Sequence, residues 1–241
     1  MHSNRYSRQM ILPDMGQSGQ DALARAKILV IGAGGLGCPA LLYLVGAGIG
    51  HIGIMDHDTV DVTNLHRQIL YTPNDVGLNK AEAAQAYLET YNPDIQIIAI
   101  AERMTFDNAE KWINDYDLII DGTDNFEAKF LINDLCVKTS KPYITASVLR
   151  FEGQVSLFAN DVQSACYRCL YPSVKHPPMN CSQAGVLGSV AGMIGTTQAS
   201  EAVKWVCGLS TLKNKVYEKF LFNCSSYCIL FINIFRSITK S

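Results

Sequence analysis

A glycine-rich turn between two short apolar runs constrains this chain more than any other feature of its sequence. The first run, Lys27–Ile31, ends at Gly32-Ala33-Gly34-Gly35-Leu36-Gly37, and the second, His51–Met55, ends at Asp56. Apolar runs of this length predict buried strands, and the residues between them predict a turn followed by a helix. The order strand, turn, helix, strand and acid is typical of a nucleotide-binding βαβ unit.

The glycines and the acid of this segment have separate expected roles. We expect Gly32 to permit the tight turn and Gly37 to let the following helix pack closely on the strand. Gly34 would let the backbone approach a phosphate, which the free N–H groups of the helix N-terminus would face. Asp56 stands where a carboxylate accepts hydrogen bonds from ribose hydroxyls. The segment therefore predicts a bound nucleotide without saying which one, and a purely structural glycine turn is the alternative.

Composition excludes several classes of protein. The 241 residues suffice for a sizeable core, and 48% apolar with 17% charged residues is ordinary for a globular protein. A net charge of −2 argues against an obligate nucleic-acid partner, which would call for a basic excess. No apolar run reaches the length of a membrane span, so no membrane association is expected. Eight cysteines without an evident signal peptide predict reduced thiols in a cytoplasmic protein.

The order of apolar runs and helical patterns predicts the fold. Through about residue 148, short apolar strands alternate with helices, which is typical of a Rossmann-like, doubly wound, mostly parallel α/β sheet. Beyond that point, the pattern favours antiparallel C-terminal strands that continue the sheet. We expect one domain over 1–241, with a nucleotide-binding half at about 1–148.

The expected element bounds follow from composition and from Gly and Pro breakers. The segment 166–188, with Pro172, Pro177 and Pro178, shows no helical period and is expected to be an irregular loop. Further helices are expected at 19–26, 80–91, 106–114, 126–139 and 190–206. Further strands are expected at 95–100, 117–120, 142–147, 154–159, 215–223 and 227–235.

Three charged residues follow expected strand ends, which is where ligands bind in a parallel sheet. Arg67 and Lys80 come after the second strand, and Asp124 comes after the apolar run 117–120. A triphosphate needs cations beside its phosphates and a carboxylate for Mg²⁺, so the three residues together predict a triphosphate site. Taken singly, Arg67 is explained as a surface residue, Lys80 as a helix start and Asp124 as an N-cap.

The cysteines carry two separate hypotheses. Cys166 and Cys169 form a Cys-x-x-Cys, which is half of a structural zinc site. The other half would have to come from Cys224 and Cys228, whose spacing differs and which lie in an expected strand. Cys181, in the irregular loop, is a nucleophile if its surroundings lower the pKa of its thiol, and an ordinary loop cysteine otherwise.

Seven motifs in a fixed order resemble those of the ThiF/MoeB/HesA adenylyltransferases, relatives of the ubiquitin-activating enzymes. The resemblance runs from about Arg5 to Leu209. The motifs are Arg-Tyr-x-Arg-Gln at 5–9, Gly-x-Gly-Gly-Leu-Gly at 32–37, Asp-x-Asp-x-Val-x-x-x-Asn-Leu-x-Arg-Gln at 56–68, Gly-x-x-Lys at 77–80, Thr-Asp-Asn at 123–125, Cys-x-x-Cys at 166–169 and Asn-Cys-x-x-Ala-Gly at 180–185. Within the family, the segment 178–185 looks more like the thiamin-pathway members, with the molybdopterin-pathway members as the alternative.

The resemblance implies an enzyme that binds Mg-ATP and the C-terminal Gly-Gly tail of a small ubiquitin-like sulfur-carrier protein. The terminal carboxylate of the carrier attacks the α-phosphate, which gives an acyl-adenylate and pyrophosphate. Residues from about 149 to 241 would form a carrier-binding half with a crossover loop. A homodimer is implied because Arg8 resembles an arginine that reaches into the partner subunit's site, and a sulfur-donor enzyme is a further expected partner.

The resemblance also implies roles for single residues of this sequence. Gly35 and its neighbours would hold the phosphates, Asp56 the ribose, and Asp124 the magnesium ion with Asn125 beside it. Cys181 matches a cysteine that can join the activated end of the carrier. The implied nucleotide-binding residues are Gly32, Gly34, Gly35, Gly37, Asp56, Asp58, Asn64, Arg67, Gln68, Lys80, Asp124 and Asn125. The implied catalytic residues are Arg8, Arg67, Lys80, Asp124 and Cys181.

One departure from the family pattern leaves alternatives open. Family members usually carry a second Cys-x-x-Cys after the last strand, and none occurs up to Ser241, so zinc at Cys166 and Cys169 would need other ligands. A non-catalytic carrier-binding scaffold is one alternative, suggested by this altered tail. A nicotinamide-dependent dehydrogenase is another, because it would share the glycine turn and Asp56 but would not need Arg67, Lys80 and Asp124 grouped at the carboxyl edge of the sheet.

Overall fold

A computed structural model describes residues 5–162, 164–172, 185–213, 215–220 and 232–233. The strands in this part of the chain are β1 (Lys27–Ile31), β2 (His51–Met55), β3 (Gln96–Ile100), β4 (Leu118–Asp121), β5 (Tyr143–Leu149), β6 (Glu152–Phe158), β7 (Lys215–Phe220) and β8 (Ile232–Asn233). They form one sheet in the order β3-β2-β1-β4-β5-β6-β7-β8. Neighbouring strands from β3 through β2, β1 and β4 to β5 are parallel, and neighbouring strands from β5 through β6 and β7 to β8 are antiparallel. The predicted Rossmann-like sheet with antiparallel C-terminal strands is confirmed.

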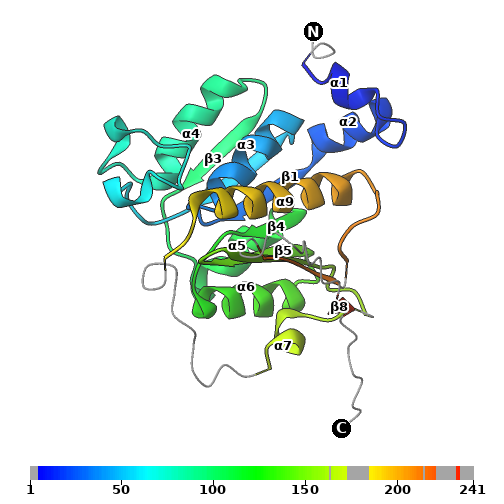
Figure 1. Ribbon diagram of the computed structural model, residues 1–241. Coiled ribbons are helices and arrows are strands. Elements are labelled where there is room, and N and C mark those ends of the chain that lie inside the picture. Colours follow the sequence, from blue (N-terminus) through cyan, green and yellow to red (C-terminus); the bar gives the residue numbers. More distant parts are fainter. Residues whose placement is uncertain (1–4, 163, 173–184, 214, 221–231, 234–241) are drawn as a thin grey trace.

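Helices cover both faces of this sheet (Figure 1). α3 (Gly37–Ala47), α4 (Lys80–Tyr91) and α9 (Gly188–Val206) lie on one face, and α6 (Phe126–Lys138) lies on the other. The remaining helices are α1 (Ser7–Met10), α2 (Gly16–Arg25), η1 (Val62–Asn64), η2 (Pro73–Asp75), α5 (Phe106–Asn114) and α7 (Tyr167–Leu170). No helix of the described ranges is long and apolar enough to cross a membrane.

The central strands are buried on both faces because their side chains alternate between two cores. Ile28 and Val30 of β1 join the core beneath α3 and α9, whereas Leu29 and Ile31 join the core beneath α5 and α6. All four side chains are at most 4% exposed. This two-sided burial explains why β1 reads as a continuous apolar run rather than as an alternating one.

Several element bounds differ from the sequence prediction. β6 begins at Glu152 rather than 154, because β5 and β6 are joined by a two-residue turn in which Arg150 has a positive φ of 54°. α2 begins at Gly16, whose φ of 55° permits the turn that precedes the helix. The short helix α7 lies within the segment predicted to be irregular. The predicted strand 227–235 is described only at β8.

Candidate functional site

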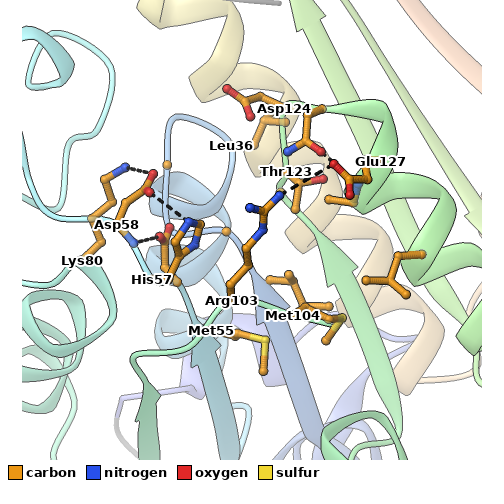
Figure 2. A pocket seen from close by; sticks show the side chains of 18 of the residues that line it. Leu36, Met55, His57, Asp58, Lys80, Arg103, Met104, Thr123, Asp124 and Glu127 are labelled. Atoms are coloured by element: carbon orange, nitrogen blue, oxygen red, sulfur yellow. Dashed lines mark hydrogen bonds and ion pairs between the residues drawn. The ribbon is translucent and has the colours of Figure 1, made fainter. Parts of the chain in front are cut away.

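A cavity of about 1030 Å³ opens at the carboxyl ends of β1, β2 and β4. Figure 2 shows Lys80, Asp58 and His57 on one side of it, Thr123, Asp124 and Glu127 on the other, and Arg103 between them. Of the described helices, α3, α4, α5, α6 and α9 begin at its wall, so their N-terminal dipole ends make it favourable for anions. The predicted site residues that line it are Gly32, Gly34, Gly35, Asp56, Asp58, Arg67, Gln68, Lys80, Asp124 and Asn125.

The glycine turn has the geometry that its sequence predicts. Gly32 has a φ of 92°, and a Cβ there would lie 2.9 Å from the backbone of Gly122. A Cβ on Gly37 would overlap the carbonyl oxygen of Gly32, so this helix start packs directly on the turn. Any side chain at either position would push the turn out of place. Gly34 and Gly35 line the cavity, where a phosphate would meet bare backbone.

Asp56 follows β2 and is only 9% exposed. Its Oδ2 accepts a hydrogen bond from the Ala33 N–H at 2.8 Å, and its Oδ1 accepts one from the Asp58 N–H at 2.9 Å. Burial raises the pKa of Asp56, and these two backbone hydrogen bonds oppose that rise. Each carboxylate oxygen keeps a further lone pair, so Asp56 can still accept hydrogen bonds from a ligand.

Lys80 and Asp58 form an ion pair at the cavity wall. Lys80 is 5% exposed, and its Nζ lies 3.0 Å from Asp58 Oδ2. Nε2 of His57 lies 3.4 Å from the other oxygen of Asp58, whose side chain is half exposed. Burial alone would raise the pKa of Asp58, but Lys80, His57 and Arg103 outweigh it and hold the pKa below its usual value. In this pair, the Asp58 carboxylate is therefore accessible from the cavity, whereas the Lys80 side chain is buried.

The segment after β2 places Arg67 and Gln68 at the cavity and Asn64 behind them. Nη2 of Arg67 donates to Oδ1 of Asn64 at 2.7 Å, and Asn64 is not among the lining residues. Gln68 is 4% exposed, and its Oε1 has no hydrogen-bond partner within the described part of the chain. Asn64 therefore orients Arg67, and Gln68 keeps a buried polar atom unsatisfied beside the glycine turn.

In the loop between β4 and α6, Asn125 rather than Asp124 caps the helix. Oδ1 of Asn125 accepts a hydrogen bond from the Ala128 N–H at 2.9 Å, so Asn125 is the N-cap of α6. The alternative interpretation of Asp124 as this cap is wrong. The Asp124 side chain is exposed to the cavity, and no described residue forms a hydrogen bond or ion pair with it. A carboxylate without a protein partner suits a hard cation.

A buried network beneath this loop was not predicted. The Asp121 carboxylate is fully buried and accepts hydrogen bonds from Lys129 Nζ at 2.9 Å and from Thr145 Oγ1 at 2.6 Å. It also accepts bonds from the N–H and hydroxyl of Thr123 at 2.9 and 2.6 Å. Two features of the sequence could have indicated it: Asp121 ends an apolar strand, and Lys129 occupies a buried position of α6.

Arg103 is a cavity residue that sequence reasoning missed. It follows the carboxyl end of β3, the same kind of position that drew attention to Asp56, and its Nη2 lies 3.8 Å from Oε2 of Glu127 (Figure 2). Both side chains are exposed, so the pair holds them only weakly. Arg103 therefore adds to the cavity a positively charged side chain that only a weak ion pair holds in place.

Gly37 and Asn64 lie just behind the cavity lining, and the remaining predicted residues lie away from the cavity or outside the described residues. Arg8 is exposed on α1 and does not line the cavity, and Cys181 lies outside the described residues. The Sγ atoms of Cys166 and Cys169 lie 3.5 Å apart. No further His, Cys, Asp or Glu in the described ranges completes a metal-binding group with them. Cys224 and Cys228 also lie outside these ranges.

Comparison with known proteins identifies close relatives. A family model described as the ThiF family matches residues 6–235. The adenylyltransferase and sulfurtransferase MOCS3 of Culex quinquefasciatus is 48% identical over 206 residues, which are 85% of this chain and 47% of that protein. The chain therefore spans about half the length of this relative. The sulfur carrier protein adenylyltransferase of Thermus thermophilus is 44% identical over 86% of this chain and 78% of that protein.

Among solved structures, the fold matches an ATP complex. The crystal structure of E. coli MccB with ATP superposes with a TM-score of 0.84 at 26% identity, over 100% of this chain and 74% of that chain. The similarity covers the sheet and the helices on both of its faces.

Proposed function

This chain belongs to the ThiF family, and we propose that it is an adenylyltransferase acting on a small ubiquitin-like sulfur-carrier protein. The reaction joins the carrier's C-terminal Gly-Gly carboxylate to the AMP moiety of ATP and releases pyrophosphate. The Thermus thermophilus relative is named a sulfur carrier protein adenylyltransferase, which supports this proposal. So does the resemblance of seven ordered motifs to the same family.

One structural observation carries the proposal. Arg67, Lys80 and Asp124 come from separate segments of the chain, and all three line the same cavity as Gly32 and Gly34. The attacking carboxylate and the triphosphate are both anionic, so they meet only where cations neutralise them. A dehydrogenase would need no such group of charges beside its glycine turn. A non-catalytic scaffold would not need them either.

The residues present fit Mg-ATP. Among the described residues, none forms a hydrogen bond or ion pair with the Asp124 carboxylate, and none forms a hydrogen bond with the buried amide oxygen of Gln68. Gly34 presents bare backbone to the same space. When bound at Asp124, Mg²⁺ would supply positive charge to the phosphate oxygens during the in-line displacement.

The chain's own groups bind and orient the reactants. Asp56 accepts hydrogen bonds from the ribose, and its position is fixed by the Ala33 and Asp58 N–H groups. Arg67 and Lys80 offset the charge of the triphosphate. No proton transfer is needed for the attack, because the carrier's carboxylate is ionised at neutral pH. Catalysis then consists of positioning and charge neutralisation.

The finer assignments extend the same proposal. We infer a carrier of the thiamin pathway from the segment 178–185, with the molybdopterin-pathway carrier as the alternative, since both use the same adenylation chemistry. Arg8 is exposed on α1, which is compatible with a homodimer in which it reaches the partner subunit's cavity. Cys181 would join the activated carrier in a later sulfur-transfer step with a sulfur-donor enzyme.

Carrier-dependent exchange of labelled pyrophosphate into ATP tests the proposal. Two Gly-Gly-ending carriers, one from each pathway, are compared at equal concentration, and the preferred carrier identifies the pathway. Wild-type protein that binds NADH and shows no exchange with either carrier would overturn the proposal.

Asp124→Ala is expected to abolish this exchange, because the variant loses the carboxylate that would hold Mg²⁺. The exposed Asp14, which lies outside the cavity, provides the matched control Asp14→Ala, for which we expect wild-type rates. Near-normal exchange in Asp124→Ala would show that the metal role is misassigned. Cys181→Ala should leave this half-reaction intact.

A further inference from the structure

A buried tyrosine lies between three parts of the cavity wall without touching the cavity itself. Tyr71 is 6% exposed and is not among the lining residues. Its hydroxyl lies 2.8 Å from the carbonyl oxygen of Ala33, within the glycine turn, and 3.0 Å from the carbonyl oxygen of Lys80, the first residue of α4. Its backbone N–H donates to the carbonyl oxygen of Gln68 at 3.2 Å.

We propose that Tyr71 is a positioning residue for the nucleotide, which fixes the glycine turn, the start of α4 and the Arg67–Gln68 segment relative to one another. The inference rests on the proposed function, because it concerns the same ATP site. It assigns a role to a residue that no sequence motif singled out.

The first link in this role is the Ala33 peptide. The Ala33 N–H donates to Asp56, and the Ala33 carbonyl oxygen accepts from Tyr71 and from the Cys38 thiol, 3.2 Å away. A thiol is a weak donor, so the tyrosine hydroxyl is the main partner of this carbonyl. Fixing the Ala33 peptide also fixes the N–H that orients Asp56.

The second link is the backbone of Lys80. Its N–H donates to the Asp58 carbonyl oxygen at 2.9 Å, and its own carbonyl oxygen lies within reach of Tyr71. The Lys80 ammonium pairs with the Asp58 carboxylate. The direction of this side chain into the cavity therefore depends on a backbone that Tyr71 helps to hold.

The hydroxyl acts as a donor and not as a base. It carries one hydrogen, which the nearer carbonyl oxygen, that of Ala33, accepts alone or shares with that of Lys80. Burial raises the pKa of Tyr71 far above neutral pH, and the nearby Cys38 and Asp56 act in the same direction. The hydrogen bond is therefore present throughout the working pH range, and its effect is on affinity rather than on pH dependence.

Tyr71→Phe tests the role, because it removes the hydroxyl and keeps the ring. We expect Mg-ATP affinity, measured by calorimetry without carrier, to fall by about 2- to 10-fold, the range for losing one buried hydrogen bond. Exchange at saturating ATP should stay within about twofold of wild type, so KM rises while kcat holds. Tyr87→Phe, an exposed tyrosine on α4, is the matched control with unchanged affinity.

A double variant separates positioning from general stability. If Tyr71 acts through Lys80, then Tyr71→Phe should weaken ATP binding less in the Lys80→Ala background than in the wild type. Unchanged affinity in Tyr71→Phe would overturn the inference, and a loss of equal size in both backgrounds would overturn the link through Lys80. Wild-type protein that binds ATP without carrier-dependent exchange would instead remove the proposed reaction and leave this test valid.

Discussion

Two lysine–aspartate pairs lie at strand ends on either side of the glycine turn, and they differ chiefly in the exposure of the acid. Lys80 and Lys129 are 5% and 4% exposed, and their ammonium groups lie 3.0 and 2.9 Å from Asp58 and Asp121. The Asp58 side chain is half exposed, whereas Asp121 is fully buried. The two lysines are equally buried, so the difference in exposure between the pairs lies in the acids, and Lys129 Nζ also donates to the carbonyl oxygen of Ala146 at 2.6 Å.

The accessibility of the acid decides what each pair can do. The Asp121 carboxylate accepts four hydrogen bonds, so it is satisfied within the protein and holds the loop that carries Asp124. Asp58 faces the cavity, where water can hydrate it if Lys80 turns toward a phosphate. We therefore interpret the Lys129–Asp121 pair, called here the closed pair, as structural. The Lys80–Asp58 pair, called here the open pair, is the one whose lysine can leave its acid and bind a ligand.

The largest expected effect is the loss of the closed pair. Lys129→Met should lower the free energy of unfolding by about 3–5 kcal/mol, because it leaves the buried Asp121 charge without its cation. Denaturant titration measures this loss. Lys138→Met, which breaks the exposed pair with Glu110, is the control and should change stability by less than about 1 kcal/mol.

Adding the substitution Asp121→Asn tests whether the unpaired charge of Asp121 causes this loss of stability. Combined with Lys129→Met, it removes the unpaired charge and should recover part of the lost stability. Equal losses in the Lys129→Met and Lys138→Met variants would mean that the closed pair is no more structural than an exposed one.

The next effect is on activity. Lys80→Met should lower kcat/KM for ATP in the exchange assay by about 10- to 100-fold, or about 1.4–2.8 kcal/mol of transition-state stabilisation. Its stability should fall by less than about 1 kcal/mol, because Asp58 remains hydrated at the cavity. A stability loss comparable with that of Lys129→Met would break the distinction between the two pairs.

The smallest effect concerns pH. The folded protein holds the pKa of Asp58 below its unfolded value, so the pair contributes stability above about pH 4 and loses it as the pH falls through the folded pKa. Melting temperatures of wild type and Lys80→Met should therefore differ most at pH 6–7 and converge toward pH 3. A difference in melting temperature that grows as the pH falls would contradict a lowered pKa of Asp58 in the folded protein.

Local sequence patterns predicted much of the fold. The bounds of the helices Lys80–Tyr91 and Phe106–Asn114 agree with the structure, because their composition and flanking breakers act within a few residues. The family identified from motifs is also confirmed. The convergence of Arg67, Lys80 and Asp124 followed from one rule, that parallel strands end at the same edge.

Contacts between distant segments were not predictable in the same way. The hydrogen bond between Asp121 and Thr145 depends on the parallel register of β4 and β5, which no local pattern specifies. The link from Tyr71 to Ala33 spans 38 residues and depends on how a loop folds back. Asp124 and Asn125 are adjacent and chemically similar, so only the backbone shows which of them caps the helix.

The reversal of strand direction at β5 gives the two ends of the sheet different evolutionary freedom. Among the residues that the structure describes, all that line the cavity precede the β5–β6 turn except Arg168, Val186 and Ala191. Substitutions or insertions in the antiparallel end therefore leave the strand ends around the cavity unaltered. If the antiparallel end binds the proposed carrier, a change of carrier therefore requires no change in the residues at these strand ends.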